Sequence, residues 1–268
     1  MKIKRNIIQL SIVLFLASIP LIAIPQRYCD FIQRVQEYQD CAKLRSFSGY
    51  SYIDTTTFST ETYLAFFDHL VLAKGMKINL YYFDNFLDGN PYLYALKETQ
   101  TLENIINRLS RKRGKSNKPK LTKHESVYRF LNDSSSKAKN YLKPQNTDEG
   151  FLQYLFFSEM GEQFALKWHA NYNDKYIICS SDMLKDVIAK FKASEMVSVD
   201  SLSLCRLEKL STCPVIERNS KYCTITWIEN RTHSGIYKCT YQINTRNPYR
   251  IVRTNEEMLL EIAINVIY

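Results

Sequence analysis

CTITWIE (residues 223–229) and IYKCTYQI (residues 236–243) decide how the C-terminal part of this chain folds. Polar and apolar residues alternate along each run, which is typical of strands that bury one face. The residues between the two runs, NRTHSG, have the composition of a hairpin connection. We therefore predict two adjacent antiparallel strands within a β-meander.

The most apolar stretch outside the N-terminus lies upstream of this hairpin, FLQYLFFSEMGEQFALKWHANY (residues 151–172). Its hydrophobic residues cover nearly the whole circumference of a helix, which predicts a buried central helix. KYIICSS (residues 175–181) follows as a buried strand. SDMLKDVIAKF (residues 181–191) is expected to form a helix that Ser181 caps.

The last segment, TNEEMLLEIAINVIY (residues 254–268), permits two interpretations. Thr254 and Glu257 have the spacing of a capping box, which favours a helix. The β-branched residues late in the segment favour a strand. We predict the helix and keep the strand as the alternative.

Residues 27–110 predict a lobe of helices with one β-hairpin. Apolar residues recur every three or four positions in the first helix, and Ser59 or Thr60 precedes the second as a cap, with Gly75 at its end. Two β-rich runs flank an Asp-Gly turn, which predicts the hairpin. The expected elements of this lobe are helices at 28–45, 61–74 and 101–108, and strands at 77–83 and 92–98, and a short helix at 125–131 is expected in the segment that follows.

Together these elements predict an α+β fold. Its N-terminal lobe holds helices plus a β-hairpin, and its C-terminal lobe holds the buried central helix and a mostly antiparallel β-meander. A segment rich in polar, charged and turn-forming residues separates the two lobes and is interpreted as a linker. The predicted boundaries are 1–26 for a leader, 27–110 for the N-terminal lobe, 111–146 for the basic and polar linker, and 147–268 for the C-terminal lobe.

The N-terminus has the pattern of a secretory signal. Lys2, Lys4 and Arg5 precede an apolar run at 7–25, and an apolar run after positive charges predicts export. The run lacks a clear small-x-small cleavage site, and its length is close to the roughly 20 residues that span a bilayer. It is therefore predicted to be either a cleaved signal peptide or an uncleaved signal-anchor, with the body periplasmic, on the surface or extracellular.

The formal net charge of +9 comes from two short segments. The leader supplies three basic residues and the tract 108–123 supplies eight, neither holds an acid, and the rest of the chain is nearly balanced. The tract lacks the interleaved aromatic residues that stack on bases, so no nucleic acid partner is expected. It is compatible with a solvated linker, the interpretation we favour, or with binding of an anion. Its basic residues are Arg108, Arg111, Lys112, Arg113, Lys115, Lys118, Lys120 and Lys123.

Seven cysteines follow the leader, and cysteines of an exported chain are usually disulfide partners. Cys29 and Cys41 lie on one predicted helix about 18 Å apart, which is too far for a bond between them. Each is therefore predicted to bond elsewhere in the chain or to be buried as a thiol. The candidates are Cys29, Cys41, Cys179, Cys205, Cys213, Cys223 and Cys239, and their pairing is left open.

Several motifs of catalysis and cofactor binding are absent from the sequence. The seven glycines are too far apart for a P-loop or a dinucleotide-binding loop. The histidines and cysteines show no metal-ligand spacing, and the G-x-S-x-G motif of hydrolases is missing. We predict neither a cofactor nor a metal site.

One group of ionisable residues stands out on the helix predicted at 151–172. Glu162 and His169 lie two turns apart on the same side of that helix, and Glu159 lies near them. Such groups on an apolar helix need partners or a cleft. They are predicted to be either an acid–base pair that faces a substrate or, as we favour, a structural network or the more solvated stripe of the helix.

These observations favour an exported, non-enzymatic binding or interaction module of the cell envelope. The 19 tyrosines suit an interface, and the expected partner is a protein or an envelope polymer. One alternative is a small extracytoplasmic hydrolase that uses Glu162 and His169. The other is a membrane-tethered module whose basic tract contacts an anionic surface polymer, in which case the membrane is contacted only through the uncleaved N-terminal segment.

Overall fold

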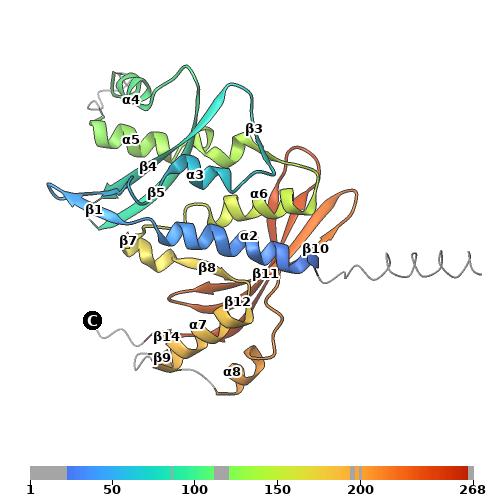
Figure 1. Ribbon diagram of the computed structural model, residues 1–268. Coiled ribbons are helices and arrows are strands. Elements are labelled where there is room, and N and C mark those ends of the chain that lie inside the picture. Colours follow the sequence, from blue (N-terminus) through green and yellow to red (C-terminus); the bar gives the residue numbers. More distant parts are fainter. Residues whose placement is uncertain (1–22, 86, 112–120, 194–196, 199–200, 265–268) are drawn as a thin grey trace, which may run out of the picture.

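The computed structural model describes residues 23–85, 87–111, 121–193, 197–198 and 201–264, in layers that alternate between helices and sheets (Figure 1). All strand pairs among these residues are antiparallel. Helices precede and follow a hairpin in the N-terminal part, and a meander forms the C-terminal part. The protein therefore has the predicted α+β fold.

The helices are α2 (Ala23–Asp40), α3 (Thr60–Ala65), α4 (Leu102–Arg111), α5 (Lys123–Leu131), α6 (Asp148–Met160), α7 (Ser181–Ala193) and α8 (Ser201–Leu207), with the 3-10 turns η1 (Ser134–Ser136), η2 (Ala138–Tyr141) and η3 (His169–Asn173). The strands are β1 (Leu44–Phe47), β2 (Tyr50–Ile53), β3 (Leu70–Leu72), β4 (Met76–Asn85), β5 (Asp88–Lys97), β6 (Leu142–Pro144), β7 (Lys167–Trp168), β8 (Lys175–Ile178), β9 (Val197–Ser198), β10 (Val215–Arg218), β11 (Tyr222–Arg231), β12 (Gly235–Asn244), β13 (Ile251–Glu261) and β14 (Ala263–Ile264).

The larger sheet carries the predicted meander. Its order is β10–β11–β12–β13, and β8 pairs with the remaining part of β11. β11 and β12 are the hairpin expected from the alternating runs, and they pair in register from Tyr222 and Asn244 to Arg231 and Gly235. Gly235 has a φ of +127°, and a Cβ at this position would meet the carbonyl oxygen of Leu260. The hairpin therefore requires glycine at its turn.

Alternation along these strands buries both faces of the sheet. Trp227 and Tyr241 face the central core, which the helices α2 and α6 also line. Ile228, Ile236 and Leu260 point to the opposite face, where they pack against α7 and α8. The sheet is thus held between two layers of helices, as Figure 1 shows.

The smaller sheet, of order β4–β5–β7, is also covered on both faces. Phe83 and Leu96 pack against α4 and α5 in a separate cluster. Leu93 is buried against the central core from the other face, and Ile78 and Leu80 pack beside it. β4 lies at one edge of this sheet.

The helix α2 joins the central core to the larger sheet. Ile32 and Val35 on its inner face are fully buried. Gln36 accepts a hydrogen bond from the amide of Ile177 at 2.7 Å and donates one to the carbonyl oxygen of the same residue at 3.0 Å. The amide side chain therefore completes the backbone hydrogen bonding of β8.

The helix predicted at 151–172 is wrong beyond Met160. The Thr147 side chain caps α6 by accepting from the amide of Gly150 at 3.0 Å, and the helix ends at Gly161. Ala165 and Trp168 both have a φ of +50°, which no α-helix accommodates. Residues 161–172 instead form a loop, the short strand β7 and η3, so the apolar character of this region reflects burial rather than helix.

The helix predicted at 254–268 is wrong, and the strand alternative is right for its described part. β13 pairs with β12 along most of its length, from Ile251 opposite Ile243 to Glu261 opposite Gly235. Backbone pairing with an existing sheet and the β-branched residues outweigh the capping-box spacing. Residues 265–268 lie outside the described part.

Two N-terminal helices are shorter than predicted. α3 ends at Ala65, because the chain turns to form β3, which pairs with β6. α2 ends at Asp40, and the following residues enter the β1–β2 hairpin. The predicted Ser59 cap is present, and its side chain accepts from the amide of Thr62 at 3.3 Å.

Part of the segment interpreted as a linker is built into the fold. α5 begins with a capping box formed by Thr122 and Glu125, and Leu131 at its end is buried. Residues 112–120 and the leader up to residue 22 lie outside the described residues. In the part that is described, no helix combines the length and the apolar character that a bilayer span needs.

Candidate functional site

The structure separates the ionisable group predicted on one helix. Glu159 stands on the last turn of α6, Glu162 in the loop that follows, and His169 in η3. Glu159 and Glu162 line one hollow of about 170 Å³ together with Ser158 and Lys137. His169 is exposed and is not part of the lining of this hollow. The proposed acid–base pair is therefore not assembled.

Glu162 has a structural contact inside the hollow. Its Oε1 accepts a hydrogen bond from the amide of Leu93 on β5 at 2.6 Å. Burial raises the pKa of the Glu162 carboxyl above its usual range, although the Leu93 amide, Lys137 and Lys139 partly offset this. Glu159 is paired instead with Lys175, whose Nζ lies 3.5 Å from its carboxylate.

Glu162→Gln is expected to stabilise the protein at pH 7 and to leave its stability unchanged near pH 4. A carboxyl with a raised pKa favours folding below the pKa of the unfolded chain, and this contribution is lost as the pH rises through the folded pKa. Glutamine keeps the acceptor for the Leu93 amide but carries no charge to bury. Urea unfolding at both pH values measures the difference, and an equal effect at both would show that burial does not perturb this carboxyl.

His169 belongs to a row of rings at the protein surface. Its ring lies 5.9 Å from that of Trp168 and 5.5 Å from that of Tyr172, which in turn lies 5.1 Å from His233. Trp168 and Tyr172 are each 60% exposed. The row is a surface feature, and the carboxylates of α6 are not part of it.

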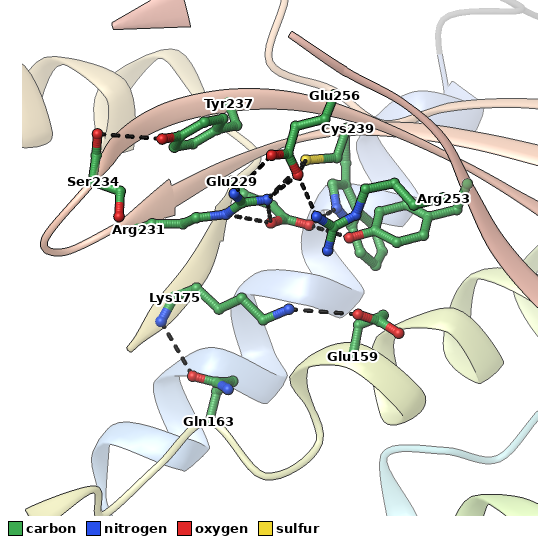
Figure 2. Close-up of polar contacts among 12 residues, drawn as sticks. Glu159, Gln163, Lys175, Glu229, Arg231, Ser234, Tyr237, Cys239, Arg253 and Glu256 are labelled. Carbon is green, nitrogen blue, oxygen red and sulfur yellow. Dashed lines mark hydrogen bonds and ion pairs between the residues drawn. The ribbon is translucent and has the colours of Figure 1, made fainter. Parts of the chain in front are cut away.

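A polar network that sequence analysis missed lies on the core face of the larger sheet (Figure 2). The carboxylate of Glu229 is fully buried, yet it accepts hydrogen bonds from Trp227 Nε1 at 2.8 Å and from the Tyr241 hydroxyl at 2.7 Å. Arg231 donates to the other carboxylate oxygen at 3.1 Å and also binds Glu256. The alternating pattern at 223–229 places Glu229 on the same strand face as Trp227, but Arg231 was expected in the hairpin connection and Glu256 in a helix, so the network was not predicted.

The network fixes the ionisation of its members. Burial opposes the charge on Glu229, but Lys175, the donors Tyr241 and Trp227, and Arg231 more than offset it, so the pKa of Glu229 lies below its usual range. Burial raises the pKa of the nearby Cys239 thiol to about 12. A carboxylate with all its donors in place and a thiol that stays protonated are suited to structure rather than to catalysis.

The cysteines and the basic tract fall in several places. Cys41 and Cys205 are exposed, Cys223 and Cys239 are buried on β11 and β12, and Cys29, Cys179 and Cys213 lie close together. The basic tract is described only in part. Arg108 and Arg111 stand in the last turn of α4 and Lys123 at the start of α5. The other five basic residues of the tract, Lys112, Arg113, Lys115, Lys118 and Lys120, lie outside the described residues. No cluster of metal-ligating side chains occurs in the described ranges.

The strongest candidate for a binding site is a hollow of about 560 Å³ between β2 and β4, called here the aromatic hollow. Six of its lining residues are tyrosine or phenylalanine, and His124 of α5 closes one side. Tyr50 and Tyr52 on β2 are 67% and 47% exposed. The lining residues are Tyr50, Ser51, Tyr52, Ile53, Thr55, Phe58, Thr60, Leu80, Tyr81, Tyr82, Phe83, Asp84 and His124.

The aromatic hollow runs along two strand edges, because consecutive residues of both β2 and β4 line it. Leu93 on β5 donates its amide to Glu162, away from its partner Leu80 on β4. The Leu80–Leu93 pair is therefore a non-hydrogen-bonded pair, and the backbone groups of Leu80 point to the outer edge of β4. Because this orientation repeats at every second residue of a strand, the backbone groups of Ile78 and Tyr82 also point to the outer edge of β4.

The outer edge of β4 remains available. Among the described residues, the amides of Ile78, Leu80 and Tyr82 have no hydrogen-bond acceptor. β2 lies beside β4 at one end of the hollow, where the amide of Ser51 binds the Asp84 carboxylate, which Lys167 of β7 also binds at 3.0 Å. An edge with free backbone donors beside aromatic side chains is suited to bind an extended chain.

Comparisons of this chain with protein-family models, with curated proteins and with solved structures gave no match. The function is therefore argued from the site.

Proposed function

We propose that this protein is a non-enzymatic binding module of the cell envelope that holds an extended polypeptide segment in the aromatic hollow. The observation that carries the proposal is the free outer edge of β4 with six aromatic residues around it. The exported location rests on the leader pattern of Lys2, Lys4, Arg5 and the apolar run after them.

The chemistry of the hollow favours a peptide strand over other ligands. Backbone amides and carbonyls along β4 supply main-chain hydrogen bonds to an added strand, and side-chain hollows next to the edge supply selectivity. Tyrosine contributes large contact area and a hydroxyl at low entropic cost, since it has only two side-chain torsions. Four of the 19 tyrosines of the chain line the hollow, which supports this choice of ligand.

The hydrolase alternative has less support. Glu162 has a raised pKa in a hollow, which is a property of catalytic acids. However, the hollow around it is small, its carboxylate is engaged by the Leu93 amide, and His169 is elsewhere. The alternative of a membrane-tethered module depends on the leader and on the basic tract, most of which lie outside the described residues. It therefore does not help to choose between the hollows.

Selection of a random dodecapeptide display library on the immobilised protein tests the proposal. Enriched peptides, made synthetically, are expected to bind the wild type, and the double variant Tyr50→Ala, Tyr52→Ala is expected to bind about tenfold more weakly, a loss of about 1.4 kcal/mol. Tyr172→Ala removes an equally exposed tyrosine outside the hollow and serves as the matched control. Titration calorimetry measures each affinity.

Backbone methylation of a selected peptide tests the mode of binding. An added strand donates only every second amide to the edge that it pairs with. N-methylation of one alternate set of residues should therefore abolish binding, while methylation of the other set is tolerated. No enriched peptide, or equal loss with Tyr172→Ala, would contradict the assignment of the site. Equal tolerance of both methylated sets would contradict strand addition.

A further inference from the structure

Three cysteines that are far apart in the sequence meet where α2 crosses the larger sheet. Cys29 lies on α2, Cys179 follows β8, and Cys213 precedes β10. The Sγ atoms of Cys29 and Cys213 are 3.2 Å apart. Cys179 directs its thiol to the carbonyl oxygen of Cys29 at 3.6 Å and to the sulfur of Met183 at 3.6 Å.

The geometry distinguishes one pair in this cluster. A disulfide requires its sulfurs at about 2.05 Å, so Cys29 and Cys213 need to approach by little more than 1 Å. Cys213 is only partly buried and lies in the irregular chain between α8 and β10, which is free of sheet pairing. Cys179 is almost fully buried one residue after Ile178, the last residue of β8 that pairs with β11. Cys213, whose sulfur lies next to that of Cys29 in a segment free of sheet pairing, is therefore the partner that the geometry favours.

We propose that Cys29 and Cys213 form a disulfide bond that ties α2 to the start of β10. The two thiols lose two protons and two electrons, and a new sulfur–sulfur bond forms. The electrons reduce the disulfide of an oxidant, either a thiol–disulfide oxidoreductase or oxidised glutathione, to two thiols. The inference does not depend on the ligand of the aromatic hollow.

The same surroundings set when the bond forms. The thiol of Cys179 and burial hold the pKa of Cys29 far above its usual range, and burial raises the pKa of Cys213 to about 11. Thiolate is the reactive form, so the folded protein oxidises slowly at neutral pH. The bond is expected to form during folding, before the core closes over Cys29.

Peptide mapping tests the pairing directly, because trypsin places each of the seven cysteines on a separate peptide. The full chain is refolded with reduced and oxidised glutathione, alkylated in denaturant without reductant, and digested. Mass spectrometry should find YCDFIQR (28–34) linked to LSTCPVIER (210–218), and the peptides of Cys41 and Cys205 alkylated. Alkylated Cys29, or Cys29 linked to the Cys179 peptide YIICSSDMLK (176–185), would overturn the proposal.

A stability measurement gives a second readout. Reductant is expected to lower the thermal midpoint of the wild type and of Cys205→Ser, a control at an exposed cysteine on α8. Cys213→Ser is expected to show the same midpoint with and without reductant. A midpoint of Cys213→Ser that still falls on reduction would show that the stabilising bond lies elsewhere.

Discussion

Replacement of Trp227 by alanine is expected to lower the free energy of unfolding by about 3–5 kcal/mol, the range for large aromatic side chains in a core. The indole is only 1% exposed, and its ring centre lies 5.3 Å from that of Tyr241. Its Nε1 is also one of the donors to the buried carboxylate of Glu229. The change therefore leaves a cavity and removes one hydrogen bond from a buried charge.

The chain contains one other tryptophan, which gives a matched control. Trp168 is 60% exposed, so Trp168→Ala is expected to change the unfolding free energy by no more than about 0.5 kcal/mol. Urea unfolding followed by far-ultraviolet circular dichroism measures both variants without relying on the removed fluorophore. Similar losses in the two variants would contradict the assignment of Trp227 to the core.

Arg231→Met is expected to cost about 1.5–3 kcal/mol at pH 7, because it removes the hydrogen bonds that the guanidinium donates to the buried Glu229 carboxylate, while Lys175 still offsets the charge. In the wild type the pKa of Glu229 is lowered, so its ionised form stabilises the fold above the unfolded pKa, about 4.3. That contribution is lost as the pH falls through the lower, folded pKa. In the variant, Lys175, Tyr241 and Trp227 still favour the ionised form, but the contribution of Arg231 is lost, so the pKa of Glu229 rises towards its usual range.

The pH dependence of the Arg231→Met effect follows from this rise in pKa. The gap in unfolding free energy between wild type and variant should be largest at pH 7 and should shrink towards pH 4, where Glu229 in the variant takes up a proton. Arg253→Met is the control, since Arg253 binds Glu256 but makes no hydrogen bond to Glu229. It is expected to cost less than about 1 kcal/mol. A pH-independent gap for Arg231→Met would mean that its guanidinium does not hold Glu229 ionised.

The sequence predicted best the elements whose pattern is local. β11 and β12 alternate strictly, and Gly235 stands at their turn, so pattern and backbone preference agree. At 161–172 they disagree: apolar residues continue, but Lys167 and Trp168 pair with Gly89 and Asp88 of β5. That pairing depends on β5, which is far away in the sequence. The periodicity of apolar residues within 161–172 contains no information about such a distant partner.

The aromatic hollow was predictable only in part. Tyr81 and Tyr82 lie on a strand that the hairpin pattern predicted, but the strand carrying Tyr50 and Tyr52 was not foreseen. The hollow exists because this strand is held beside β4 by the contact between Ser51 and Asp84. Likewise, the predicted alignment of Glu162 with His169 assumed a helix that ends before either residue.

The position of α2 in the core affects how the chain folds while it is being synthesised. This helix is made early, but Phe31 packs on Phe156 of α6 and Gln36 binds the backbone of Ile177 on β8, and both of these partners belong to segments made much later. Contacts of such high contact order slow folding. Aromatic residues of segment 58–67 contact α2, but until α6 and β8 have been synthesised the rest of its apolar side lacks cover, which exposes the nascent chain to aggregation. The protein is therefore expected to depend on a holding chaperone until its synthesis is complete.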